Sequence, residues 1–95
     1  MSLEKKIMDN MKDAMRAKNT VALEALRAIK AAIIIAKTDS GAAEGLTEED
    51  EIKMLQRLVK MRKDSATIFT EQNRMDLAEP ELAQIAVIEQ FLPAQ

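Results

Sequence analysis

Four cations near the middle of the sequence are the residues whose type and spacing point most directly to chemistry. Lys53, Arg57, Lys60 and Lys63 recur at intervals of three or four residues, and no acid lies between the first and the last. On a helix this spacing gathers them on one side, where they would offer positive charge to phosphates. The row predicts a surface for nucleic acid or a protein partner. The alternative is an ordinary solvated face of a long helix.

The rest of the composition restricts how such a row would bind. The formal net charge is −2, so any binding of nucleic acid must rest on a local patch. No Trp or Tyr is present, and neither of the two Phe residues flanks the row. Since bases of single-stranded RNA are usually held by stacking on aromatic rings, we expect contacts to the phosphate backbone alone.

Catalytic groups are scarce in this sequence. It contains no Cys and no His, which excludes disulfides, thiolate nucleophiles, Cys/His zinc sites and imidazole catalysis. Ser65 near Lys60 and Lys63 suggests a Ser–Lys pair, but a helical projection separates Lys60 from the serine. We therefore expect no catalytic residue, no metal ligand and no cofactor, and we expect the isolated chain to catalyse nothing.

Arg62 is the one cation that falls within an apolar stripe. A buried guanidinium without a partner costs several kcal/mol. We therefore predict that Arg62 is structural and finds a carboxylate or backbone carbonyls, with a structural ion pair as the expected contact. The candidate partners are Glu24, Asp9, Asp13, Glu81 and Glu89. The alternative is that Arg62 binds a phosphate or carboxylate ligand in a cleft.

The basic row, Ser65 and Arg62 all belong to the stretch Leu46–Asn73, which carries the longest helical pattern. Thr47 can cap its start, and the acids that follow place negative charge at the positive end of the helix. An apolar face runs through Ile52, Leu55, Leu58, Val59, Ala66 and Phe69. One side of this helix is therefore built for burial, and the basic row lies opposite.

Three further helices are predicted around it. The first follows Ser2 as N-cap. The second spans about 21–37, has a stripe of Leu23, Leu26, Ile29 and Ile33, and is expected at the centre of the bundle. The loop 38–45 contains both glycines. The last helix is expected to start at Pro80, after a turn at 74–79, with Leu82, Ile85, Ile88 and Leu92 facing inward.

These elements predict an all-α fold, a single-domain bundle of four helices with a long third helix. Apolar residues outside the stripes would dock a protein partner or a second copy, and they are Ile34, Ile35, Met54 and Met61. The longest apolar run, Ala31–Ala36, is too short to span a bilayer, so no membrane association is expected. Without a visible signal peptide, the cytoplasm is the expected location.

Several segments resemble the YqeY family of bacterial GatB/YqeY-domain proteins. They are Met11–Met15, Leu26–Arg27, Lys30–Ala32, the residues Lys60, Arg62, Lys63, Asp64, Ser65 and Phe69, the segment Arg74–Ala78 without Met75, and Glu81, Ile85, Ile88 and Phe91–Gln95. The match follows the chain in order over almost its whole length. It departs at Asn19, where the family often has Asp, and at Gln84, where it often has Glu.

This resemblance implies that residues 1–95 are the N-terminal helical domain of that family, without its smaller C-terminal domain similar to the GatB tail. It further implies an accessory of the glutamine-dependent Asp-tRNA/Glu-tRNA amidotransferase, a carbon–nitrogen ligase, with tRNA or amidotransferase subunits as partners. Because function argued from kinship is associational, a helical protein-interaction module unrelated to tRNA is the alternative.

Overall fold

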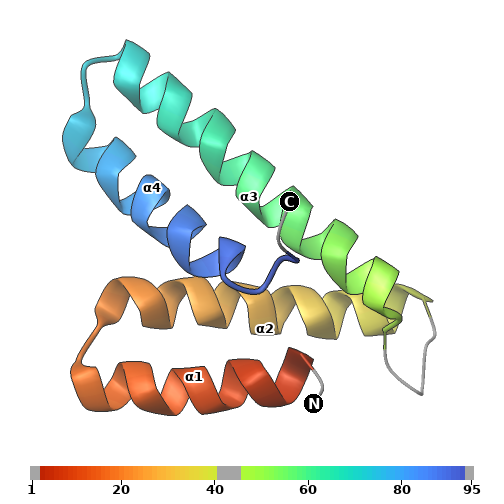
Figure 1. Ribbon diagram of the computed structural model, residues 1–95. Helices are drawn as coiled ribbons and strands as arrows, with labels where there is room; N and C mark the ends of the chain where they lie inside the picture. Colours follow the sequence, from red (N-terminus) through yellow and green to blue (C-terminus); the bar gives the residue numbers. More distant parts are fainter. Residues whose placement is uncertain (1–2, 41–45, 94–95) are drawn as a thin grey trace.

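The computed structural model describes residues 3–40 and 46–93, which form four helices and no strand (Figure 1). The helices are α1 (Leu3–Ala17), α2 (Thr20–Ser40), α3 (Glu48–Glu71) and α4 (Met75–Glu89). The predicted all-α bundle with a long third helix is confirmed. The expected cap Ser2 and most of the predicted glycine-containing loop lie outside the described residues.

Side-chain caps set two of the helix starts. The Asn19 side-chain oxygen accepts a hydrogen bond from the backbone N–H of Ala22 at 3.1 Å, just after Lys18 turns the chain with a φ of 56°. The Thr47 hydroxyl accepts from the backbone N–H of Asp50 at 3.1 Å. Both contacts satisfy N–H groups that lack a partner within their helix. The predicted cap of the third helix is confirmed.

Two helix boundaries differ from the prediction. Helix α2 continues through Thr38, expected in the loop, and ends at Ser40. Helix α4 begins at Met75 and contains Pro80 within it. The backbone N–H groups of Leu77 and Ala78 both donate to the Arg74 carbonyl. Because Ala78 is fully buried, packing against the bundle outweighs the loss of the proline's hydrogen bond.

Helix α2 is the centre of the bundle, as predicted, and it contacts all three other helices. Figure 1 shows α1 antiparallel beside α2. Helix α4 lies between α2 and α3, and the C-terminal end of α3 lies beyond α2. The buried core draws on every helix and comprises Leu3, Ile7, Ala14, Ala25, Leu26, Ile29, Ile33, Leu55, Val59, Ile85 and Ile88. Helix α3 therefore approaches α2 near its start and packs mainly against α4 further along.

The inner face of α4 is rotated from the expected one. Ile85 and Ile88 are buried as predicted, but Leu82 is exposed. With Ala78 as the first buried position, the inward stripe passes through Glu81 and Ile85, and Leu82 falls to its side. Leu82 therefore lies at the edge of the inward face, which is centred on Ala78, Ile85 and Ile88.

Candidate functional site

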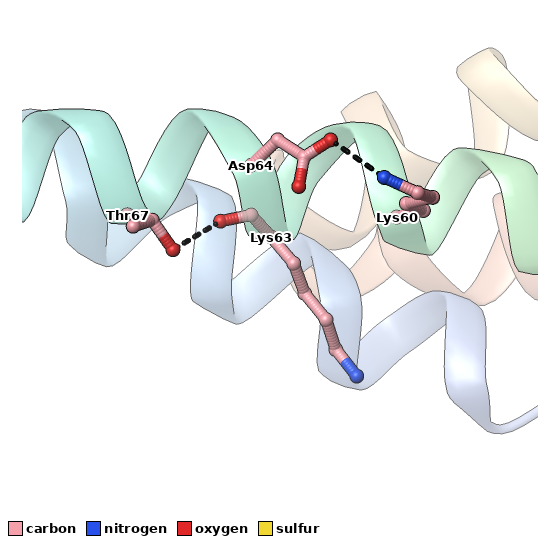
Figure 2. Close-up of polar contacts among 4 residues, drawn as sticks. All are labelled: Lys60, Lys63, Asp64 and Thr67. Atoms are coloured by element: carbon pink, nitrogen blue, oxygen red, sulfur yellow. Dashed lines mark hydrogen bonds and ion pairs between the residues drawn. The ribbon is translucent and has the colours of Figure 1, made fainter.

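The basic row is exposed and partly neutralised within α3 itself. The Lys53 ammonium lies 3.2 Å from a Glu49 carboxylate oxygen, and the Lys60 ammonium lies 3.1 Å from one of Asp64 (Figure 2). Both pairs join residues four apart on exposed helix surface, where such pairs contribute about 0.2–0.5 kcal/mol each. Two of the four cations therefore already have a carboxylate nearby.

The other two cations have no such neighbour within the part of the chain that the structure describes. Lys63 is exposed, and Figure 2 shows its side chain extending away from the Lys60 ammonium, while the Thr67 hydroxyl donates to the Lys63 backbone carbonyl at 2.9 Å. Among the described residues, the side chain of Arg57 makes no hydrogen bond or ion pair. The role of the row in binding nucleic acid stays a prediction.

A groove of about 470 Å³ separates α2 from α3 beside this row. Its apolar lining consists of Ala32, Ile35, Ala36, Leu46, Met54 and Leu58, and its charged lining of Asp39, Asp50, Lys53 and Arg57. The groove thus joins residues that the sequence suggested for two different surfaces. An apolar trough edged by a few charged groups suits a protein segment better than a flat phosphate backbone.

The structure divides the four predicted docking residues between two faces. Ile35 and Met54 line the groove, and Met61 is exposed two turns further along α3. Ile34 instead lies between α1 and α2, where it shares a cavity of about 130 Å³ with Met8. Ile34 and Ile35 are adjacent in the sequence, yet the rotation of about 100° per residue in an α-helix directs them to different faces of α2.

One exposed residue on the α3 flank was missed by the sequence analysis. Ile68 is half exposed and lies seven residues beyond Met61, which itself lies seven residues beyond Met54. A repeat of seven is the signal that could have revealed it, since it defines a second apolar stripe beside the core stripe. We call Met54, Leu58, Met61, Ser65 and Ile68 the outer stripe of α3.

Arg62 is half-buried and held by polar groups at the junction of three helices. Its Nε donates to the Gln84 amide oxygen at 2.9 Å, and its Nη1 donates to the Leu58 carbonyl at 3.2 Å. The Gln84 amide nitrogen in turn donates to a Glu24 carboxylate oxygen at 3.3 Å. Arg62, Gln84 and Glu24 therefore connect α3, α4 and α2.

Arg62 meets a backbone carbonyl, as the prediction allowed, but the expected ion pair with a carboxylate is wrong. Among the described residues no carboxylate lies within 4 Å of its guanidinium, and the candidate Glu24 is reached only through Gln84. The physical reason is that Gln84 projects from α4 into the space between α3 and α2, so the amide occupies the position nearest the guanidinium. The neutral amide can accept from one neighbour and donate to the other.

Two carboxylates have shifted pKa values. Burial raises the pKa of Glu51 above its ordinary range, and the nearby Glu48 and Glu4 carboxylates raise it further. The Arg74 guanidinium beside Asp76 lowers the pKa of that carboxyl, and the hydrogen bonds between them measure 2.9 and 3.0 Å. Neither residue lies in the groove, and Asp76 is exposed in the first turn of α4. Both pKa shifts therefore arise from burial and local contacts away from the groove.

Residues 3–40 and 46–93 lack two features, one typical of metal-binding proteins and one typical of membrane-spanning proteins. These residues contain no group of three or more acidic side chains arranged to hold a metal ion. None of their helices combines the length and the apolar character needed to cross a membrane.

Comparison with known proteins assigns the chain to a family. The family described as "Yqey-like protein" matches residues 4–95. This chain belongs to the YqeY family. The resemblance stated from single residues is thereby confirmed over essentially the whole sequence.

Several fungal proteins are similar to this chain. A protein of Clavispora lusitaniae named "Altered inheritance of mitochondria protein 41, mitochondrial" is 37% identical over 83 residues, covering 87% of this chain and 47% of its own length. A protein of the same name from Pyrenophora tritici-repentis is 34% identical and covers 90% and 46%. An uncharacterized Schizosaccharomyces pombe protein is 33% identical and covers 96% and 69%. The chain spans about half the length of the first two relatives.

The expected cytoplasmic location is wrong on this comparison. The relatives from Clavispora lusitaniae and Pyrenophora tritici-repentis are both named as mitochondrial proteins. The expectation rested on the absence of a visible secretory signal, which is a weak criterion because it does not distinguish the cytoplasm from an organelle. The names of these YqeY relatives also mention neither tRNA nor an amidotransferase.

Proposed function

We propose that this YqeY-family chain is a binding domain that docks a protein partner in the groove between α2 and α3. The observation that supports this most is the groove itself, where Ile35 and Met54 meet the unpaired Arg57 at one accessible surface. Apolar side chains supply the affinity of such a surface, and a charge at its edge supplies orientation.

The partner that kinship favours is a subunit of the glutamine-dependent Asp-tRNA/Glu-tRNA amidotransferase. The support is the resemblance to GatB/YqeY-domain proteins, and the chain would act as a non-catalytic accessory of that carbon–nitrogen ligase. The names of the fungal relatives support a mitochondrial site of action. A protein-interaction module without any connection to tRNA is the alternative within the same binding mode.

The test is capture of a purified GatB subunit by the immobilised chain. We expect Met61→Lys to weaken capture at least tenfold, because it places a charge on the outer stripe of α3, whose members Met54 and Leu58 line the groove. Met8→Lys is the matched control, since Met8 is similarly exposed but lies on α1. Capture that survives Met61→Lys would contradict docking at this surface. No capture of GatB by the wild-type chain would remove the amidotransferase from the proposal.

A second candidate function is contact with the tRNA backbone, and it is favoured by the two exposed cations that lack a carboxylate, Arg57 and Lys63. With about two phosphates contacted, the logarithm of the affinity should fall by roughly 1.4–1.8 per tenfold rise in salt. Titration of bulk tRNA at two salt concentrations measures this slope. We expect Arg57→Glu/Lys60→Glu to abolish binding. The control Lys12→Glu/Lys30→Glu changes the charge equally but on α1 and α2, and equal losses in both variants would contradict a specific row.

A further inference from the structure

We propose that the groove and the outer stripe of α3 are covered by a second copy of this chain, with the two α3 helices packed antiparallel about a twofold axis near Met61. The proposal rests on the proposed function, in that it takes the same groove as the docking surface. In the isolated protein, the groove is occupied by a second copy of the chain.

The first argument is the spacing of the outer stripe. Met54, Leu58, Met61, Ser65 and Ile68 follow one another at intervals of four, three, four and three. This is the repeat by which two helices pack along a shared seam. Leu55, Val59 and Ala66 form the buried side of α3, and Met54 and Leu58 of the outer stripe pack partly against that core. Met61 and Ile68 continue the outer stripe as exposed apolar side chains, which the bundle of a single chain does not require.

The second argument is exposure along that seam. Met61 is 57% exposed and Ile68 is 51% exposed, and Ile35 across the groove is 60% exposed. Scattered apolar side chains are common on protein surfaces, but these fall on one continuous flank beside a groove. Burying them against a like surface would remove all three from water at once.

The third argument is fit about the twofold axis. If Met61 lies at the axis, antiparallel pairing brings the residue seven before it opposite the residue seven after it. Met54 of each copy then faces Ile68 of the other, so each copy's Ile68 reaches the groove beside Ile35. The groove is lined by Ala32 and Ala36 on the α2 side, and these small side chains allow close approach of a second helix.

The fourth argument is charge, and it selects the antiparallel orientation. Arg57 and Asp64 are seven residues apart, so they lie on the same edge of the outer stripe. Antiparallel pairing about Met61 sets Arg57 of each copy near Asp64 of the other, twice in the dimer. Parallel pairing would place the edges that carry Arg57 and Asp64 on opposite sides of the dimer, so Arg57 of one copy could not reach Asp64 of the other. Arg57 has no ion-pair partner within the described residues, and Asp64 has only its exposed contact to Lys60.

That contact to Lys60 does not compete strongly with the proposed pair. Figure 2 shows it on the open surface of α3, and exposed pairs of this kind contribute little to stability. The guanidinium can bind a carboxylate through two parallel hydrogen bonds, whereas an ammonium cannot. Covering the stripe would also exclude water from around the Arg57–Asp64 pair and strengthen it.

The experiment begins with the mass of the wild-type chain by sedimentation equilibrium across micromolar to near-millimolar concentrations. We expect a concentration-dependent monomer–dimer equilibrium, weakened at least tenfold in Met61→Lys and in Arg57→Asp. Asp64→Arg should weaken it similarly, and the exchange Arg57→Asp/Asp64→Arg should restore most of the lost affinity. Lys12→Asp on α1 is the control with the same charge change as Arg57→Asp, and its dimerisation should equal that of wild type.

The orientation is tested by cross-linking, which the absence of native Cys makes clean. With a short bismaleimide, Met61→Cys should form a covalent dimer with itself. Met54→Cys and Ile68→Cys should each cross-link poorly alone and efficiently when the two variants are mixed. Efficient self-cross-linking of Met54→Cys would indicate parallel helices and overturn the proposed arrangement.

The outcomes separate this inference from the proposed function. A wild-type chain that stays monomeric throughout, yet captures GatB in a Met61-dependent manner, would overturn self-pairing and leave the docking function intact. A dimer with the expected charge and cross-linking behaviour that captures no GatB would support self-pairing and count against that partner. A dimer indifferent to Met61→Lys and to the charge exchange would overturn the inference.

Discussion

Replacing Ile29 by alanine is expected to lower the free energy of unfolding by about 2–5 kcal/mol. Ile29 is fully buried on the central helix α2, in the core built from all four helices. The substitution removes apolar contacts and leaves a cavity that the surrounding helices cannot fill completely. Since domains of this size are stable by only about 5–15 kcal/mol, the loss is a large part of the total.

Urea denaturation followed by circular dichroism measures this difference. Ile34→Ala is the matched control, because it makes the same chemical change on the same helix at a side chain that is 56% exposed. We expect that variant to differ from wild type by no more than about 0.5 kcal/mol. Equal losses in the two variants would mean that α2 is not the centre of the core.

The second large effect is expected at Arg62, where alanine should cost about 2–3 kcal/mol of unfolding free energy. The change removes the guanidinium that joins Gln84 of α4 to the Leu58 carbonyl of α3, and it also removes the packing of the half-buried aliphatic stem. Arg27→Ala on α2 is the control, since Arg27 is exposed and has no hydrogen bond or ion pair within the described residues.

A double-mutant cycle tests whether Arg62 acts through Gln84. Gln84→Met leaves the guanidinium short of one acceptor and should cost about 1–3 kcal/mol. Arg62→Met/Gln84→Met removes both polar partners together, so its cost should fall below the sum of the single variants by about 1 kcal/mol. Thermal or urea unfolding provides all four values. Strict additivity would show that the contact between the two side chains contributes nothing to stability.

The Arg62 result also bears on position 84 itself. A glutamate, which the family often has there, would accept from Arg62 more strongly than an amide does. In this chain the amide nitrogen lies 3.3 Å from a Glu24 carboxylate oxygen, where a second carboxylate would repel. Glutamine therefore suits a site that must both accept from Arg62 and donate to Glu24.

The sequence by itself determined the helices and most of their inward faces. Apolar spacing placed Leu26, Ile29 and Ile33 on one side of α2, and Leu55 and Val59 on one side of α3. The Thr47 cap is a contact across three residues, and the pairs of Lys53 and Lys60 with carboxylates are contacts across four. Interactions this local follow from the geometry of a single helix, so they can be derived without knowing how the helices pack.

Only the tertiary structure decided how the faces of different helices meet. The partner of Arg62 is 22 residues away on α4, and its link to α2 spans a further 60. Periodicity gives the direction of a side chain from its own helix axis but not the angle at which two helices cross. For the same reason the sequence grouped Ile34 with Ile35, which the packing of α1 and α3 on either side of α2 separates. The start of α4 before Pro80 likewise depended on burial of Ala78, a tertiary contact that outweighs the local preference of proline.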